Sequence, residues 1–109
     1  MVKTLHEILT VRLTPAQRQA IVEETTRAFG PDTAVRLFGS RVDDTQRGGD
    51  IGLLIEAGGT PAELLDRELA LRVQLMRRLG ERRIDIVLYD PQHPPRAIDR
   101  HALQAGIRL

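Results

Sequence analysis

Three short stretches hold the residues whose types and spacing suit chemistry best. The first is Phe38-Gly39-Ser40-Arg41, the second opens with Asp50, and the third carries Asp85 inside an apolar run. A glycine lets the backbone approach a phosphate closely because it has no Cβ. The Ser40 hydroxyl and the Arg41 guanidinium would add hydrogen-bond donors, and carboxylate oxygens are ligands that Mg²⁺ prefers. The pattern therefore predicts a site that holds nucleotide phosphates over divalent metal.

The spacing of the carboxylates decides how complete this site is. Side chains two residues apart on a strand share a face, about 6.6 Å apart along the backbone. Carboxylates at positions 50 and 52 would therefore converge on one pair of metals, with Asp85 from a neighbouring strand completing the set. The chain has Gly52 at the second position. Asp85 is the hardest residue to explain structurally, because burying a charge without a partner is costly.

Other polar residues have simpler interpretations. A Gly-Ser pair alone often marks an ordinary turn, and Asp50 alone could end a loop. Tyr89 reads as strand packing. The basic run at 77, 78, 82 and 83 reads as a solvated helix end, with an anion or partner contact as the alternative. The three histidines lack metal-ligand spacing and read as surface residues: His6, His93 and His101.

Composition narrows the class of protein. The 109 residues predict one domain, 1–109, and the net charge of +1 argues against a dedicated nucleic-acid binder. Two Phe and one Tyr are too few for a base-stacking platform. The absence of cysteine excludes disulfides and thiolate metal sites. With no signal-peptide pattern and no long apolar run, we expect a soluble, cytoplasmic protein.

Start and stop signals outline the elements. A short helix is expected over 3–9, and a second begins at a Thr14–Gln17 capping box and stops at Gly30. Strands are expected over 34–38, 50–56 and 83–89, and a last helix over 95–104. The 9-residue loop between the first two strands favours antiparallel pairing, and the helical crossover favours a parallel second pair. The fold class is α/β (α+β): a small mixed sheet of about three strands packed by helices.

The helix expected from the Thr60 cap to Leu79, with Gly80 as its stop, has a wide apolar arc. Glu68 and Arg72 lie inside it at a spacing that allows an ion pair. Such an arc is wider than one side of a small sheet needs. It is either buried between the sheet and other helices or a surface for a partner, in a homodimer or a hetero-oligomer. Its residues are Ala62, Leu65, Leu69, Val73, Met76 and Leu79, broadened by Leu64, Leu71 and Leu75.

Taken together, the stretches 38–41, 49–56 and 83–88 resemble the minimal nucleotidyltransferases (MNT domains) of the DNA polymerase beta superfamily. The similarity covers about residues 14–109. Members of this branch are often antitoxins whose partner is a small helical ribonuclease with a HEPN domain. The resemblance implies a Mg²⁺-dependent enzyme that transfers AMP from ATP to a tyrosine of that toxin.

The resemblance also implies roles for individual residues. Gly39 and Ser40 would hold the triphosphate, with Arg41 matching a residue that often follows them. Asp50 would ligate both metal ions. Asp85 would ligate the catalytic metal and help to deprotonate the acceptor hydroxyl.

Position 52 departs from the family pattern, which is Asp-x-Asp. Losing this carboxylate should weaken metal binding and reduce catalysis. Gly52→Asp is the discriminating change: it should raise metal affinity and activity if the site is otherwise intact, and no gain would mean that other parts of the site have also drifted. Glu56 is too far along the strand to replace it, whereas Asp43 or Asp44 would have to swing in from the loop. The alternative function is therefore a catalytically weak binding module that neutralises its toxin by contact. A stand-alone enzyme acting on RNA or a small molecule ranks third, because one domain leaves no second domain to bind either.

Overall fold

The computed structural model describes residues 13–38 and 51–109. In chain order its elements are α2 (Pro15–Phe29), β1 (Val35–Phe38), β2 (Ile51–Glu56), α3 (Pro61–Leu79), β3 (Ile84–Tyr89), α4 (Ala97–Ala105) and β4 (Ile107–Arg108). The helix expected over 3–9 lies outside the described residues. The other expected elements are present with bounds that differ by at most two residues.

Side-chain caps explain where the two long helices begin. Thr14 Oγ1 accepts from the Gln17 backbone N–H at 3.0 Å, and Gln17 Oε1 accepts from the Thr14 N–H at 3.0 Å. The Thr60 hydroxyl likewise accepts from the Glu63 N–H at 3.2 Å. α3 ends at Gly80, whose φ of +81° suits a residue without Cβ. These local signals were all readable in the sequence.

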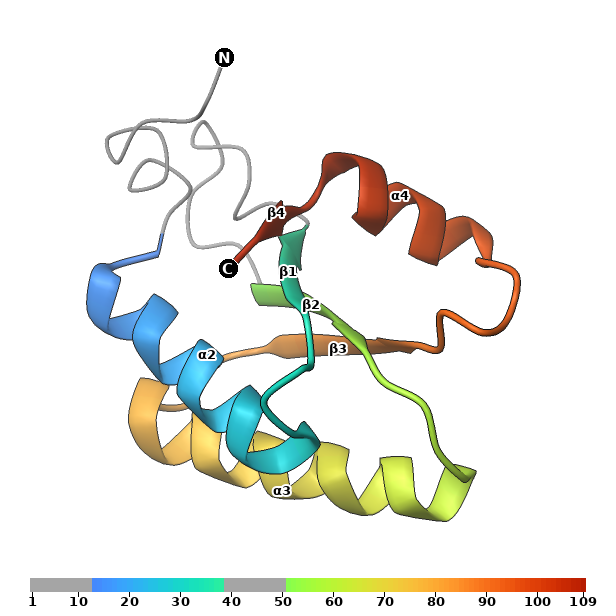
Figure 1. The fold of residues 1–109 in the computed structure, drawn as a ribbon. Coiled ribbons are helices and arrows are strands. Elements are labelled where there is room, and N and C mark those ends of the chain that lie inside the picture. Colours follow the sequence, from blue (N-terminus) through green and yellow to red (C-terminus); the bar gives the residue numbers. More distant parts are fainter. Residues whose placement is uncertain (1–12, 39–50) are drawn as a thin grey trace.

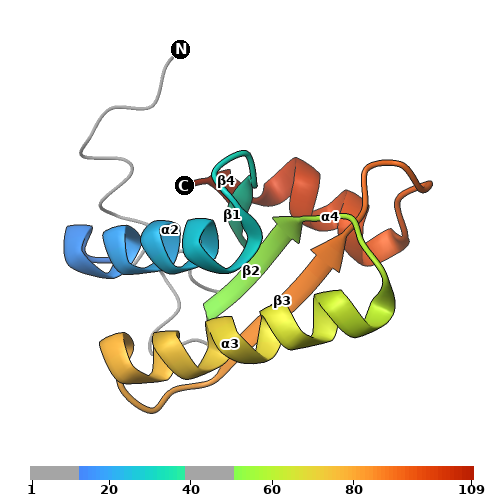
Figure 2. The same ribbon diagram turned by 60° about the horizontal axis from the view of Figure 1, so that its bottom comes forward.

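The sheet has the order β3-β2-β1-β4 and mixes both strand directions. β2 pairs antiparallel with β1. It pairs parallel with β3, as Figure 2 shows. Both directions confirm the expected pairing. The fourth strand was not expected. β4 is two residues long and pairs antiparallel with β1, placing Ile107 opposite Leu37. A two-residue strand is too short to show an alternating pattern in the sequence.

The helices cover both faces of the sheet. α2 and α3 lie on one face and α4 lies on the other (Figure 1). The larger core lies under α2 and α3 and includes the fully buried Ile21, Leu53 and Leu75. The smaller core lies under α4 and is formed by Phe38, Leu54, Val87, Tyr89, Ala102 and Leu103. Tyr89 therefore packs in the sheet as its sequence context predicted.

A buried carboxylate joins α2 to α3. The Glu24 side chain is almost fully buried and accepts hydrogen bonds from Arg27 and Arg78, each at 3.0 Å. Arg78 also donates to Glu23 at 2.8 Å. Part of the basic run at the end of α3 thus holds two helices together, so it is more than a solvated helix end.

Asp99 fixes the start of α4. It is buried, accepts from the Arg96 backbone N–H at 2.8 Å, and takes two guanidinium hydrogen bonds at 2.9 Å each. The hydrogen bonds from the Arg96 side chain hold the pKa of the Asp99 carboxyl below its usual value, against the opposing effect of burial. α4 covers the face of the sheet that carries Asp85, so this cap supports the candidate site.

The lowered pKa of Asp99 gives stability a defined pH dependence. Because the folded-state pKa lies below the unfolded value, Asp99 stabilises the fold above the unfolded pKa of about 3.9. That contribution is lost as the pH falls through the folded-state pKa. We expect Asp99→Asn to cost about 1–2 kcal/mol at neutral pH, the size of a lost cap. Thermal unfolding from pH 7 to pH 2 should show the difference from wild type shrinking towards acid, and a constant difference would contradict this role.

Within the described ranges, no helix is both long enough and apolar enough to cross a membrane.

Candidate functional site

Three strands bring Phe38, Gly52 and Asp85 into one row across the sheet. Gly52 lies opposite Phe38 in the antiparallel pair and opposite Asp85 in the parallel pair. Side chains alternate along a strand, and Phe38, Leu54 and Val87 all pack under α4. Position 52 and Asp85 therefore face the α4 side of the sheet. The expectation that these two positions lie side by side is confirmed.

The remaining predicted site residues lie outside the described residues. They are Gly39, Ser40, Arg41 and Asp50, together with the alternative ligands Asp43 and Asp44. Residues 39–50 connect Phe38 to Ile51, and both ends of this segment belong to described strands. The Ile51 N–H donates to the Arg83 carbonyl at 3.1 Å, which fixes the start of β2 against the strand that carries Asp85.

Asp85 is accessible to solvent. Its side chain is 49% exposed, and the Arg83 Nε lies 3.4 Å from its Oδ1. This long, exposed ion pair contributes little to stability. The cost of a buried charge, which favoured a site role for Asp85 in the sequence, was the wrong reason, because this side chain is half exposed. What favours a role in a site is its position beside Gly52 with an accessible carboxylate.

Gly52 is closely covered. A Cβ at this position would lie 2.8 Å from the Phe38 carbonyl oxygen and 3.1 and 3.2 Å from Cζ and Cε2 of the Phe38 ring. Contacts under 3.0 Å to backbone require the strands to shift. The Phe38 ring thus fills the space beside residue 52, as an aromatic residue opposite a glycine can do in a sheet. The structure has no room for a second carboxylate unless β1 or Phe38 moves.

Glu56 does not replace the missing carboxylate. Its Oε1 accepts from Arg36 at 3.1 Å, and both side chains are about three-quarters buried. This pair links β2 to β1 at the opposite end of β2 from Gly52. The expectation that Glu56 stays out of the metal site agrees with this pairing.

The described residues fit a metal site only in part. Among residues 13–38 and 51–109, no three His, Cys, Asp or Glu side chains gather as a metal-binding group would. Asp85 supplies an accessible oxygen ligand, and Gly52 supplies none. Mg²⁺ can bind through one or two carboxylates with substrate phosphates and water completing its shell. Any such metal would therefore depend on Asp85 and on Asp50, which lies outside the described residues.

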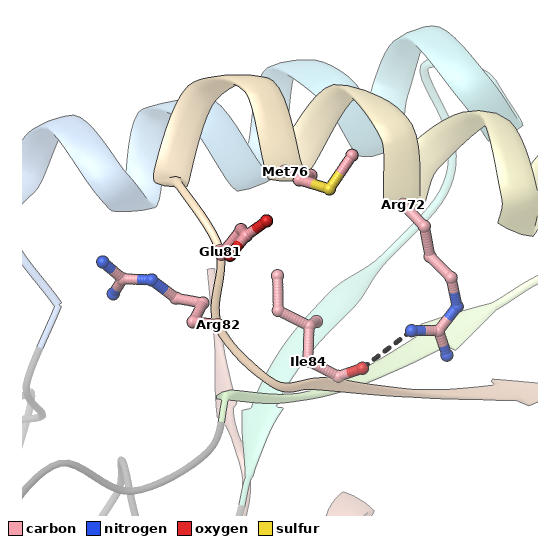
Figure 3. Close-up of a pocket in the computed structure, with 5 residues that line it drawn as sticks. All are labelled: Arg72, Met76, Glu81, Arg82 and Ile84. Carbon is pink, nitrogen blue, oxygen red and sulfur yellow. Dashed lines mark hydrogen bonds between the residues drawn. The ribbon is translucent and has the colours of Figure 1, made fainter.

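Two surface hollows lie at the ends of β3. One, of about 410 Å³, includes Asp90 and His93, whose Nδ1 lies 3.1 Å from Asp90 Oδ2. The other, of about 360 Å³, lies where α3 meets the start of β3 (Figure 3). Asp85 lines neither of them. His93 and His101 are exposed, as predicted, and His6 lies outside the described residues.

Two contacts near the starts of β2 and β3 could not be predicted from the sequence. The Phe38 ring over Gly52 depends on strand register, and Arg72 reaches from α3 to donate to the Ile84 carbonyl at 2.8 Å. The expected Glu68–Arg72 ion pair is confirmed at 3.0 Å. Besides pairing with Glu68, Arg72 thus holds α3 against the edge of β3.

Comparisons of the chain with protein-family models, with curated proteins and with solved structures gave no significant match.

Proposed function

We propose that this chain is a nucleotidyltransferase-type antitoxin that acts on a co-encoded HEPN-domain ribonuclease. The proposal rests on the three motif stretches of the sequence and on one structural observation. Gly52 and Asp85 lie opposite each other in the parallel β2–β3 pair, on the sheet face covered by α4. This is the arrangement that the motif requires of its second and third acidic positions.

The first candidate mode is transfer of AMP from ATP to a tyrosine of the toxin. Its support is the accessible Asp85 carboxylate, which is suited to accept a proton from an acceptor hydroxyl or to bind Mg²⁺. When bound, two Mg²⁺ ions would neutralise charge on the attacking and leaving oxygens. Asp50 and Asp85 would be their protein ligands, and Gly39, Ser40 and Arg41 would bind the triphosphate.

The second candidate mode is neutralisation by contact without transfer. It is favoured by the packing at Gly52, where the Phe38 carbonyl and ring fill the space that a carboxylate would need. A site that has merely lost a side chain would retain room for it. Here β1 packs closely against the glycine at position 52. This packing supports a site that functions without a second carboxylate.

Intact mass measurement separates the two modes. The chain is incubated with ATP, Mg²⁺ and the HEPN-domain protein, and the intact mass of both proteins is measured before and after the incubation. Added AMP on the HEPN protein supports transfer. An unmodified HEPN protein that co-purifies with the chain supports neutralisation by contact. A partner that is neither modified nor bound would contradict the proposed function.

Asp85→Asn tests the transfer mode directly. The substitution removes the negative charge with little change in shape, so any AMP transfer should fall by about 100-fold or more. Because Asp85 is half exposed, the melting temperature should change little. Asp90→Asn, a carboxylate beyond the end of the same strand, serves as the matched control. Undiminished transfer in the Asp85 variant would remove this residue from the chemistry.

A further inference from the structure

The outer side of α3 carries an apolar stripe without a partner in the described part of the chain. Its four large residues, which we call the α3 stripe, are exposed: Leu65 at 54%, Leu69 at 50%, Val73 at 41% and Met76 at 52%. At 3.6 residues per turn they span an arc of about 80° along the helix. The buried side of α3 is formed instead by Leu71, Leu75 and Leu79. A contiguous apolar stripe of this kind points to an interface.

The strand edge beside this stripe is protected against strand addition. Among the strands that the structure describes, β3 is the last one on its side of the sheet. Near its start the Ile84 carbonyl accepts from Arg72 at 2.8 Å, and near its end the Leu88 carbonyl accepts from Arg96 at 3.0 Å (Figure 3 shows the first). Arginines that occupy edge carbonyls hinder pairing with another chain. Association on this side of the molecule would therefore use the helix.

The charges that border the α3 stripe are arranged with opposite signs at its two ends. By helical geometry, Asp66 and Arg77 border one side of the stripe, and Glu68 and Arg72 border the other. On each side the acidic residue is nearer the N-terminus of α3 and the basic residue is nearer the C-terminus. Asp66 and Arg77 are both exposed, and neither forms an ion pair with another described residue.

This arrangement is complementary to itself when a second copy is turned end to end. In an antiparallel pair of α3 helices centred near residue 71, Leu65 meets Met76 of the second copy, and Leu69 meets its Val73. The same alignment places Asp66 opposite Arg77 of the second copy. A two-fold axis repeats this contact, so two charge pairs flank one apolar seam. Glu68 and Arg72, which pair with each other at 3.0 Å within the chain, border its other side.

We propose that the α3 stripe is the seam of a symmetric homodimer in which two α3 helices pack antiparallel. α3 has 19 residues and is therefore about 28 Å long. A seam of one helix pair buries less than the roughly 1,200 Å² of a standard stable interface, so the dimer should dissociate on dilution. This inference does not depend on the proposed function, because it uses no residue of the candidate site.

Sedimentation velocity of the full 109-residue chain over a range of concentrations tests the proposal. We expect a reversible monomer–dimer equilibrium. Leu69→Glu should raise the dimer dissociation constant at least about tenfold, because it places a charge in the seam twice. Ile98→Glu is the matched control, since Ile98 is a 43% exposed apolar residue on α4 and should leave the equilibrium unchanged. Circular dichroism of each variant verifies that it is folded.

A charge reversal makes the test specific for a second copy. Asp66→Arg should weaken the dimer, because the new arginine faces Arg77 of the second copy on both sides of the axis. Adding Arg77→Asp should restore the wild-type dissociation constant within about a factor of two, since the pair is then only reversed. A foreign partner would not be restored in this way.

Two results would overturn the proposal. The chain could remain monomeric at every concentration, or its dimer could withstand both Leu69→Glu and Asp66→Arg. If the chain is monomeric and Leu69→Glu abolishes binding to the HEPN-domain protein, the stripe is assigned to that partner instead. Loss of the dimer with intact binding to the HEPN protein would support the dimer seam.

Discussion

Gly52→Asp is expected to destabilise the fold by about 4 kcal/mol and to bring no gain in activity. The Cβ alone would meet the Phe38 carbonyl oxygen at 2.8 Å, and this oxygen belongs to the backbone of a paired strand. The carboxylate would then enter a buried position beside the Phe38 ring. Chemical denaturation of the variant measures the loss in the free energy of unfolding. Of the two outcomes that the sequence left open for this substitution, the structure favours the one without a gain.

Two further variants separate the causes of this loss. Gly52→Ala adds the Cβ without the charge and should cost about 2 kcal/mol. Phe38→Ala is itself destabilising because Phe38 is buried in the smaller core. In that background the additional cost of Gly52→Asp should be smaller than in wild type, because the ring contacts are gone and only the carbonyl contact remains. A Gly52→Asp protein as stable as wild type, with increased metal affinity, would show that β1 yields readily and would contradict this account of the site.

Leu75→Ala is expected to cost about 3 kcal/mol, whereas Met76→Ala should cost less than about 0.5 kcal/mol. These neighbours point about 100° apart around α3: Leu75 is fully buried in the larger core, and Met76 is half exposed in the α3 stripe. Both are large apolar side chains on one helix, so helix propensity and composition are matched. The difference between their losses in the free energy of unfolding therefore measures the effect of side-chain burial.

Urea denaturation at a protein concentration too low for self-association checks this pair. Raising the protein concentration should increase the free energy of unfolding of wild type more than that of Met76→Ala, because only wild type keeps the full α3 stripe. The gap between the two proteins should therefore widen with concentration. Equal losses for the two variants at low concentration would mean that the stripe is buried within the monomer, and the assignment of the two sides of α3 would be wrong.

Local signals made much of this fold predictable. The Thr14–Gln17 capping box and the Gly80 stop are satisfied within a few residues, so the sequence alone contains both partners. Strand directions followed from loop and crossover lengths. β4 was not predicted because two residues are too few to show a periodic pattern. Its pairing with β1 depends on how α4 returns the chain to the sheet.

The apolar arc of α3 shows where periodicity reaches its limit. The pattern centred the arc on Leu65, Leu69 and Met76, with Leu71 and Leu75 as its margin. The structure reverses this order, because α2 and the sheet cover the side of α3 that carries Leu71 and Leu75. Periodicity reveals how wide an apolar arc is, but which part is covered depends on where the other elements lie.

The candidate site was predictable in its layout and not in its packing. That position 52 and Asp85 would be neighbours followed from the parallel pairing of their strands. The contact of Phe38 with Gly52 required the register of β1 against β2, which no local pattern encodes. This contact bears on the choice between the two proposed modes, transfer of AMP and neutralisation by contact.

RNA cleavage by the proposed HEPN-domain partner, measured with and without this chain, tests the proposed antitoxin function most directly. The assay is run with ATP and Mg²⁺ present and again with both omitted. We predict that the chain suppresses cleavage, and that the requirement for ATP reveals which mode operates. Undiminished cleavage under both conditions, with a folded chain in excess, would contradict the proposal.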